Sequence, residues 1–216
     1  MDLYEAMSTC RAVRRLRPDP IPDDVLERLV QAAAWAPTGG NVQPWRVVLV
    51  RSPSLKQSLA ELYARSWSAY AGQVRRNLAP LPDARRAPHE RTLAAGDHLA
   101  AHFGQTPVVA VFCFDPKQMA ITDEGLDRPT VVGGGSVYPA VQNFLLAARA
   151  EGLGCVLTTL LCQHEAAVKV LLDIPAGWGT CAAIPLGWPL RKGHGPLTRK
   201  APDKLAYTDR WGAGAS

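Results

Sequence analysis

The sequence has no apolar run of the roughly 18 to 20 residues that a transmembrane helix requires, and we expect no membrane partner. Residues 1–5 include two acids where a signal peptide carries basic residues, and no apolar segment follows. The five cysteines are an odd number without a C-x-x-C pair, which argues against a zinc site or a disulfide framework. We therefore expect a cytoplasmic protein with free thiols.

The net charge is also small, at +5, because the sequence has 24 basic and 19 acidic residues. The basic residues fall in three patches, at 11–17, 75–91 and 191–204, and do not form one stripe. This pattern argues against a nucleic-acid partner. Two of the patches adjoin expected loop or helix ends, which is where a phosphate-binding site would recruit them.

Familiar catalytic motifs are missing as well. The sequence contains neither G-x-S-x-G nor H-E-x-x-H. His98 and His102 share an expected helix face, but no carboxylate or cysteine obviously joins them, and a surface or partly buried pair is favoured over a metal site. Residues 133–135 are three glycines that resemble a phosphate cradle without the P-loop lysine, and a flexible turn is favoured there. We expect no catalytic side chain and no metal.

The composition is that of a globular protein, with 47% hydrophobic and 20% charged residues. Helices and strands alternate loosely, which predicts an α/β or α+β class with one central sheet. Apolar periodicity predicts helices at 4–9, 23–35, from 54 onward, 93–103, 137–148 and 164–172. Short apolar runs predict strands at 46–50, 107–114, 155–160 and 180–186. A capping box at Asp24 and Glu27 and a helix cap at Ser136 are also expected.

Two stretches look irregular. Residues 71–91 lose periodicity and contain three prolines and five arginines, so we expect a surface excursion or a lid over a site. The segment 187–216 is rich in glycine, proline and basic residues. Thirty residues without regular structure should pack on another surface.

The loop at 36–45 separates a helical run from a strand. Pro37 ends the helix, and Gly39 and Gly40 allow positive φ and a close backbone approach. Asn41 and Gln43 add amides that both donate and accept hydrogen bonds. Such a loop can wrap a flat polar heterocycle, although an ordinary helix-to-strand connector remains the alternative.

Arg11 and Arg14 are three residues apart, so their side chains can point the same way. Two guanidinium groups placed in this way can hold a phosphate through paired hydrogen bonds. Arg199 and Lys200 near the other terminus would complete such a site. The alternative is a solvated basic surface.

Taken together, four segments resemble the FMN-dependent nitroreductase family over nearly the whole chain. C-R-A-V-R-R-L at 10–16 is similar to the family's R-R-S-x-R-x-F element, and A-P-T-G-G-N-V-Q-P-W at 36–45 is similar to its A-P-S-x-x-N-x-Q-P-W signature. S-V-Y-P-A-V-Q-N at 136–143, with G-L-G at 152–154, resembles its core helix and the following turn. I-P-L-G-W-P at 184–189 resembles the I-P-x-G-Y-P that precedes its basic tail.

This resemblance implies one nitroreductase-like FMN-binding domain over 1–216. Its expected fold is an α+β sandwich with a central mixed sheet flanked by helices. It also implies a homodimer with two flavins at the interface and a C-terminal tail extending onto the partner. The implied reaction passes a hydride from NADH or NADPH through flavin N5 to a nitroaromatic, quinone or similar acceptor, by a ping-pong mechanism. Alternatives are dehalogenation, flavin fragmentation, azoline oxidation, or storage of FMN without turnover.

The resemblance also assigns cofactor-binding residues. The flavin phosphate would be bound by Arg11, by the backbone of Ala12 and by Arg14. Arg199 and Lys200 would close over the same phosphate. The residues assigned to the flavin of the other subunit are Pro37, Thr38, Gly39 and Asn41. Those assigned to the N5 edge of the flavin are Thr158, Thr159 and Leu160. Cys10 and Ala12 depart from the family's usual arginine and serine, and each removes a possible phosphate contact.

Overall fold

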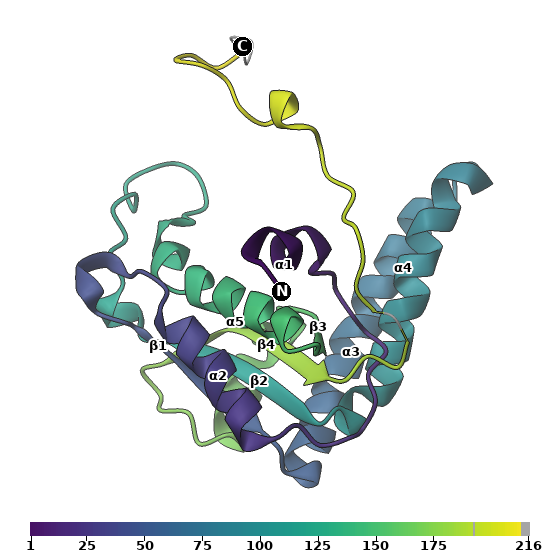
Figure 1. Ribbon diagram of the computed structural model, residues 1–216, viewed down its shortest axis with the longest axis horizontal. Coiled ribbons are helices and arrows are strands. Elements are labelled where there is room, and N and C mark those ends of the chain that lie inside the picture. The colour runs from purple at the N-terminus through teal and green to yellow at the C-terminus, as the bar shows by residue number, and fades with distance from the viewer. Residues whose placement is uncertain (192, 213–216) are drawn as a thin grey trace.

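The computed structural model describes residues 1–191 and 193–212 (Figure 1). Its described strands form one sheet in the order β1-β2-β4-β3. The strands are β1 (Trp45–Val50), β2 (Val108–Phe114), β3 (Gly154–Cys155) and β4 (Gly179–Gly187). Each neighbouring pair is antiparallel.

The expected mixed sheet is therefore wrong for these strands. Within the described ranges, the parallel pairing is an isolated bridge between Ala12 and Cys155. The central strand β2 is apolar throughout because both of its faces are covered, and antiparallel strands can be covered in this way as well as parallel ones. The α+β sandwich itself is confirmed.

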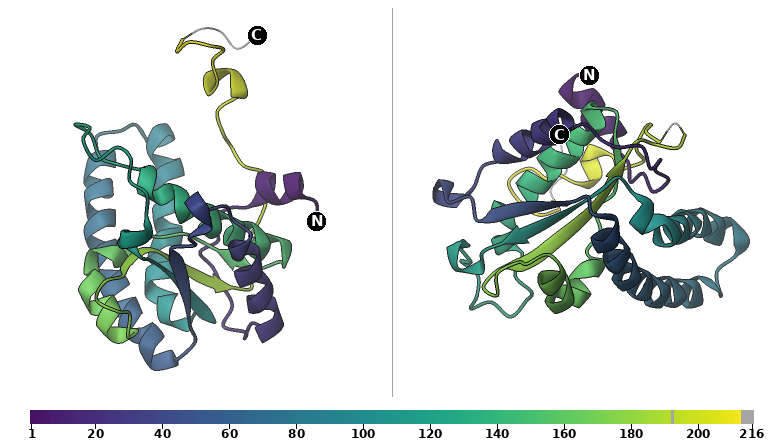
Figure 2. Two further views of the ribbon diagram at one scale, coloured as in Figure 1. Left: turned by 90° about the vertical axis from the view of Figure 1, so that its left-hand side faces the viewer. Right: turned by 90° about the horizontal axis from the view of Figure 1, so that it is seen from below.

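Helices cover both faces of the sheet (Figure 2). On one side lie α2 (Asp23–Ala34) and α5 (Tyr138–Ala150), and α1 (Leu3–Thr9) contacts α5. On the other side lie α3 (Pro53–Leu78), α4 (Asp83–His102) and α6 (Glu165–Leu171).

The side chains of β2 alternate between the two layers, as the period-two geometry of a strand requires. Val108, Ala110 and Phe112 belong to the core with α2 and α5. The intervening residues, Val109 and Val111 among them, belong to the core with α3 and α6. The sheet therefore separates two hydrophobic cores.

Both capping predictions are wrong. The residue before α2 is Pro22, which makes no side-chain cap, and Asp24 instead accepts a 2.8 Å hydrogen bond from Arg28 one turn later. Ser136 does not cap α5, because its hydroxyl accepts a hydrogen bond from the backbone N–H of Gly39 at 3.2 Å. Ser136 thus ties the loop after α2 to the start of α5.

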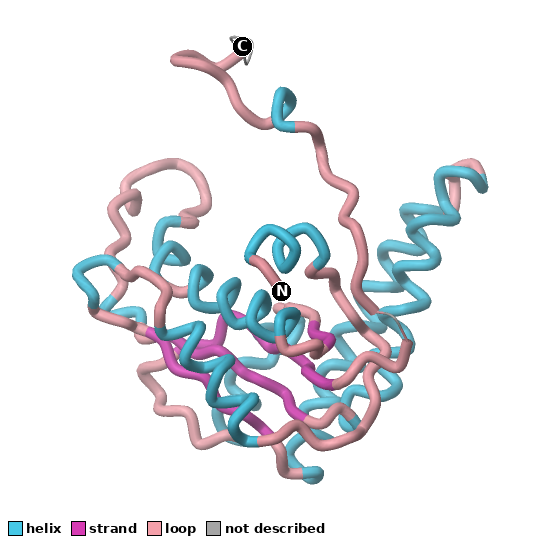
Figure 3. The backbone as a smooth tube through the Cα atoms, in the orientation of Figure 1, coloured by secondary structure: helices cyan, strands magenta, loops and turns pink. Residues whose placement is uncertain are grey.

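Residues 71–91, expected to be irregular, are mostly helical. They form the ends of α3 and α4 and the turn between them, a hairpin that extends away from the sheet (Figures 1 and 3). Periodicity is weak because only Ala71 and Leu78 are buried within this range, where they pack with Leu93 in a small cluster. A role as a lid stays a prediction.

The chain after β4 is anchored and then leaves the body. The His194 ring donates a hydrogen bond from Nε2 to the carbonyl of Leu153 at 2.9 Å. The N–H groups of Gly195 and Leu197 donate to the carbonyls of Thr9 and Ser8. Residues 198–212 are all exposed, and Figure 3 shows this segment extending into open space with one short helical turn.

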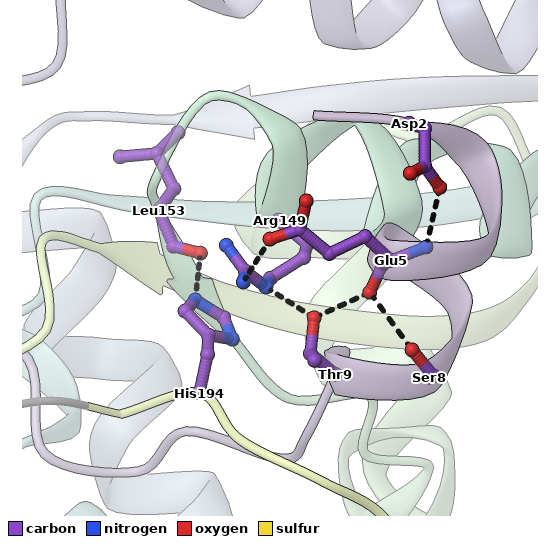
Figure 4. A network of polar contacts seen from close by, with 7 residues as sticks. All are labelled: Asp2, Glu5, Ser8, Thr9, Arg149, Leu153 and His194. Carbon is purple, nitrogen blue, oxygen red and sulfur yellow. Dashed lines mark hydrogen bonds and ion pairs between the residues drawn. The ribbon is translucent and has the colours of Figure 1, made fainter.

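A polar network beneath α1 fixes the root of this tail (Figure 4). Arg149 of α5 donates from Nε to the Thr9 hydroxyl at 2.9 Å and lies 4.0 Å from the carboxylate of Glu5. Because Thr9 also accepts the backbone bond from Gly195, α1, α5 and the tail are held together at one point.

Candidate functional site

A cavity of about 430 Å³ lies where the two ends of the chain meet. Its walls come from α1, the segment after it, α5, the residues following β3, and the tail. The lining residues are Met7, Cys10, Arg11, Ala12, Arg14, Gln142, Leu145, Cys155, Val156, Leu157, Leu197 and Arg199. Four of the twelve predicted site residues are therefore brought together: Arg11, Ala12, Arg14 and Arg199.

The segment carrying Arg11 and Arg14 is extended. Helix α1 ends because Cys10 adopts an extended conformation, with φ −69° and ψ 104°. The N–H of Val13 then donates to the carbonyl of Cys155 at 2.8 Å. The segment is thus hydrogen-bonded to the end of β3, which places both arginines on the cavity wall.

Gly154 permits this close approach. A Cβ added at Gly154 would lie 2.7 Å from a methyl carbon of Val13, a distance that real side chains do not reach. Val13 is itself buried, with 5% of its surface exposed. The G-L-G turn of the sequence therefore sets the position of the arginine segment.

Three arginines give the cavity wall a positive charge. Among the residues that the structure describes, neither Arg11, Arg14 nor Arg199 forms an ion pair with a carboxylate. Guanidinium groups match the geometry of phosphate oxygens. The donor set therefore fits a phosphate monoester, whose charge the three arginines can balance.

Tyr63 of α3 lies near Arg14 on the cavity wall and near Thr158. Burial raises the pKa of the Tyr63 phenol, and the nearby Arg14 and a hydrogen bond with Thr158 partly offset that rise. Arg14 and Thr158 thus both lie near the buried Tyr63 side chain. Tyr63 carries no sequence signal for this position, because in the sequence it belongs to an ordinary apolar helical stripe.

Thr158, Thr159 and Leu160 continue from the cavity wall along β4. Thr158 and Ala183 exchange both backbone hydrogen bonds, at 2.9 and 2.8 Å. The N–H of Leu160 donates to the Thr158 hydroxyl at 3.3 Å. The expected strand at 155–160 is wrong, since β3 ends at Cys155 and a 3₁₀ helix, Leu160–His164, begins at the end of the expected range.

The loop predicted to wrap a heterocycle lies elsewhere in the chain. Its turn has positive φ at Gly40 (58°), Asn41 (56°) and Gln43 (50°), a conformation that glycine and asparagine tolerate best. The Thr38 hydroxyl accepts a 3.1 Å bond from the N–H of Gln43, which closes the turn.

Pro37, Thr38, Gly39 and Asn41 do not line the arginine cavity. Their loop contacts the start of α5 through Ser136, whereas the cavity lies beside residues further along that helix. Figure 1 shows the loop at the left edge of the molecule, beyond the start of α5. One chain alone does not bring the two sets together.

The remaining residues have clear positions. Lys200 is exposed and does not line the cavity. The histidines at 98 and 102 stack with ring centroids 4.1 Å apart, and the described residues contain no cluster of three or more groups able to hold a metal ion. No described helix is long and apolar enough to cross a membrane.

Met7, Gln142 and Leu145 also lie on the cavity wall and were not among the predicted site residues. A signal for Gln142 was present, since it falls in the S-V-Y-P-A-V-Q-N segment that the resemblance rests on. Met7 and Leu145 carried no such signal, because apolar residues on helices most often belong to the core.

The fold is that of an α+β protein, and three arginines line one of its cavities. Residues 8–188 match the family model described as Nitroreductase family, and the chain belongs to this family of flavin-dependent oxidoreductases. It is 30% identical over 194 residues to "NADH dehydrogenase" of Thermus thermophilus, covering 90% of each chain. It is 32% identical over 207 residues to "5,6-dimethylbenzimidazole synthase" of Rhodobacter capsulatus, covering 92% of this chain and 89% of that protein.

A solved structure agrees on the fold. A BluB-like flavoprotein from Clostridium difficile superposes with a TM-score of 0.69 at 18% identity, covering 97% of this chain and all of that one. At this identity the likeness concerns the fold alone. The expected family and its fold are therefore confirmed, whereas the two named relatives carry different activities.

Proposed function

We propose that the protein is an FMN-dependent oxidoreductase that transfers a hydride from NADH or NADPH to a small acceptor such as a nitroaromatic or a quinone. The observation that carries this proposal is the cavity, where Arg11, Arg14 and Arg199 converge from distant parts of the sequence and form no ion pair with a carboxylate of the described residues. A phosphate is the natural occupant of such a donor set.

The residues present fit FMN in two further respects. Arg11 and Arg14, with the backbone of Ala12, would hold the phosphate, and Arg199 and Lys200 would close over it. The wall leads directly from there to Thr158, Thr159 and Leu160, whose backbone would supply a hydrogen-bond donor at the flavin edge. When bound, the flavin accepts and returns the hydride at N5, so the chain need only orient and bind.

We propose that donor and acceptor use the same open face of the site in turn, which gives ping-pong kinetics. The described cavity contains no pair of acidic or histidine side chains arranged for proton transfer. The protein's own part is then to hold the phosphate, position the ring and stabilise negative charge with the arginines. Cytoplasmic location stays a prediction.

We further propose a homodimer in which each tail lies on the partner. The exposed tail carries large apolar side chains, with Leu205 65%, Tyr207 42% and Trp211 92% exposed. Leaving such groups in water is unfavourable, and a second copy would cover them. Pro37, Thr38, Gly39 and Asn41 would then reach the flavin of the other chain.

The test is oxidation of NADH and NADPH by purified, FMN-loaded protein, with and without a nitroaromatic or a quinone. Double-reciprocal plots at several acceptor concentrations should be parallel, as a ping-pong mechanism requires. The Arg14→Ala protein should lose activity in proportion to its lost FMN. Protein that takes up no FMN, or holds FMN without oxidising either nucleotide, would contradict the proposal.

One alternative is favoured by a particular finding. The likeness to a 5,6-dimethylbenzimidazole synthase supports fragmentation of the flavin itself as a second candidate. Incubating the reduced, FMN-loaded protein with oxygen and analysing the products by mass spectrometry separates the two functions. Product analysis also tests two other activities, the dehalogenation of iodotyrosine and the oxidation of azolines. FMN storage would appear as bound flavin without turnover of any of these substrates.

A further inference from the structure

A second cavity, of about 510 Å³, is bounded by the proline-rich segment before α2 and by the starts of α3 and β2. Its size is in the range of sites for small ligands. The lining residues are Pro18, Pro20, Ile21, Pro22, Asp23, Arg51, Lys56, Pro107 and Val108. None of them lines the arginine cavity, so the two cavities are built from separate sets of residues.

Lys56 is a buried cation on the wall of this cavity, with 8% of its surface exposed. Its Nζ donates hydrogen bonds to the carbonyl oxygens of Thr106 at 2.6 Å and Pro107 at 3.2 Å. These bonds use two of the three N–H groups that an ammonium carries. The described residues supply no acceptor for the third, which remains available for a ligand.

The charge of Lys56 also lacks a counterion. Within the described ranges Lys56 forms no ion pair, and Asp23, the acidic residue on this cavity wall, pairs with Arg51. Burial lowers the pKa of the Lys56 ammonium, as expected when a cation is desolvated without an opposite charge. A buried charge is costly unless it is paired. An anion entering the cavity would therefore remove an existing penalty.

The rest of the wall is mainly apolar. Four of the nine lining residues are prolines, which have no backbone N–H to donate. Ile21 and Val108 add further apolar surface, and both side chains are buried. The cavity thus combines one cationic group that has no counterion with apolar walls, the usual composition of a site for a small amphipathic molecule.

The proline-rich segment is held in place at several points. The N–H of Arg17 donates to the carbonyl of Trp188 at 2.8 Å, and the Trp188 indole donates to the carbonyl of Pro20 at 3.2 Å. Arg51 donates to the carbonyl of Ile21 at 3.3 Å. The wall is therefore formed before a ligand arrives, which lowers the entropic cost of binding.

We propose that this cavity binds a small monocarboxylate with a flat apolar body. The carboxylate accepts a hydrogen bond from the Lys56 ammonium, and the apolar body lies against the proline rings. One negative charge is enough, because Asp23 already balances Arg51. A neutral molecule of the same shape would leave the Lys56 charge uncompensated and should bind more weakly.

The experiment compares benzoate with benzamide, which has the same shape but no charge. Each is titrated into purified, ¹⁵N-labelled full-length protein and followed in ¹H–¹⁵N spectra. We expect benzoate to shift the backbone N–H signals of Ile21, Asp23 and Val108 in a saturable way. Benzamide should bind roughly tenfold or more weakly, because its bond to the ammonium is not charge-assisted on both sides.

Two variants locate the binding group. Lys56→Met keeps an unbranched side chain without the charge, and it should weaken benzoate binding roughly tenfold or more. Lys169→Met is the matched control, because Lys169 also donates to a backbone carbonyl, that of Ala176 at 2.6 Å, but does not line this cavity. It should bind benzoate as the unmodified protein does.

Three results would overturn the proposal. The first is the absence of a saturable shift at Ile21, Asp23 and Val108 with benzoate, and the second is equal affinity for benzoate and benzamide. Both are read from the unmodified chain, so a variant that fails to fold does not affect them. The third is a folded Lys56→Met protein that binds benzoate with unchanged affinity.

Discussion

Replacing Arg14 by alanine removes the guanidinium that lies deepest in the proposed phosphate site. Arg14 is partly buried beside Tyr63, and its charge has no carboxylate partner among the described residues. A phosphate would therefore be its main counterion. Each charge-assisted hydrogen bond lost should cost about 1.5 to 3 kcal/mol. The dissociation constant for FMN should rise roughly tenfold to 150-fold for one lost bond.

The assay is titration of FMN with protein at fixed ionic strength, followed by quenching of flavin fluorescence. Arg14→Lys keeps the charge but loses the paired geometry, so its affinity should fall between the two. Arg85→Ala is the matched control, because Arg85 is an exposed arginine on the α4 hairpin outside the cavity. An Arg14→Ala protein that binds FMN within twofold of the unmodified protein, with unchanged thermal stability, would refute the reasoning.

Three further predictions concern the tail, the hairpin and a partly buried histidine. Deleting 201–216 should leave the body folded, because the described part of that segment is exposed, yet light scattering should show monomers and FMN binding should be lost. Gly96→Ala should lower the free energy of unfolding, measured in urea, by about 1 to 3 kcal/mol, because the new Cβ would lie 2.1 Å from the Trp67 ring. This loss is expected even though alanine favours helices more than glycine does. Burial lowers the pKa of His194, so stability should fall as the pH drops below about 6.5, where the unfolded chain binds the proton more strongly. His194→Gln should flatten that dependence in urea unfolding, and an unchanged slope would contradict it.

Local patterns predicted most elements well. The apolar run at 107–114 became β2 at Val108–Phe114, and the periodicity at 23–35 became α2 at Asp23–Ala34. In both segments the buried side chains recur at regular spacing, so the apolar pattern of the sequence matches the burial pattern in the fold. The hairpin of α3 and α4 was missed at its tip because a projecting pair of helices buries few side chains. There Pro82 marks the turn, but Pro88 lies inside a helix.

The site was predicted less completely, and the reason is physical. The charge of Arg11 and Arg14 pointed to a phosphate, and the structure places both on one cavity. Their common direction comes from the pairing of Ala12 with Cys155, a contact between residues far apart in the sequence. No local pattern encodes such a contact. The position of Tyr63 near Arg14 and Thr158 is likewise a contact between residues far apart in the sequence.

The central claim is that each FMN is shared by two chains, with Arg14 of one chain at the phosphate and Asn41 of the other at the ring. It is tested by mixed dimers that pair an Arg14→Ala chain with an Asn41→Gly chain, purified through two different tags. Glycine removes the Asn41 amide while tolerating the positive φ at that position.

In such a mixed dimer, a shared site predicts that one site carries both changes and the other carries neither. Fluorescence titration should then find one FMN bound per dimer with the affinity of the unmodified protein, although each parent dimer binds weakly at both sites. A mixed dimer that binds FMN as weakly as its parents would show that each chain builds its own site, and it would contradict the account.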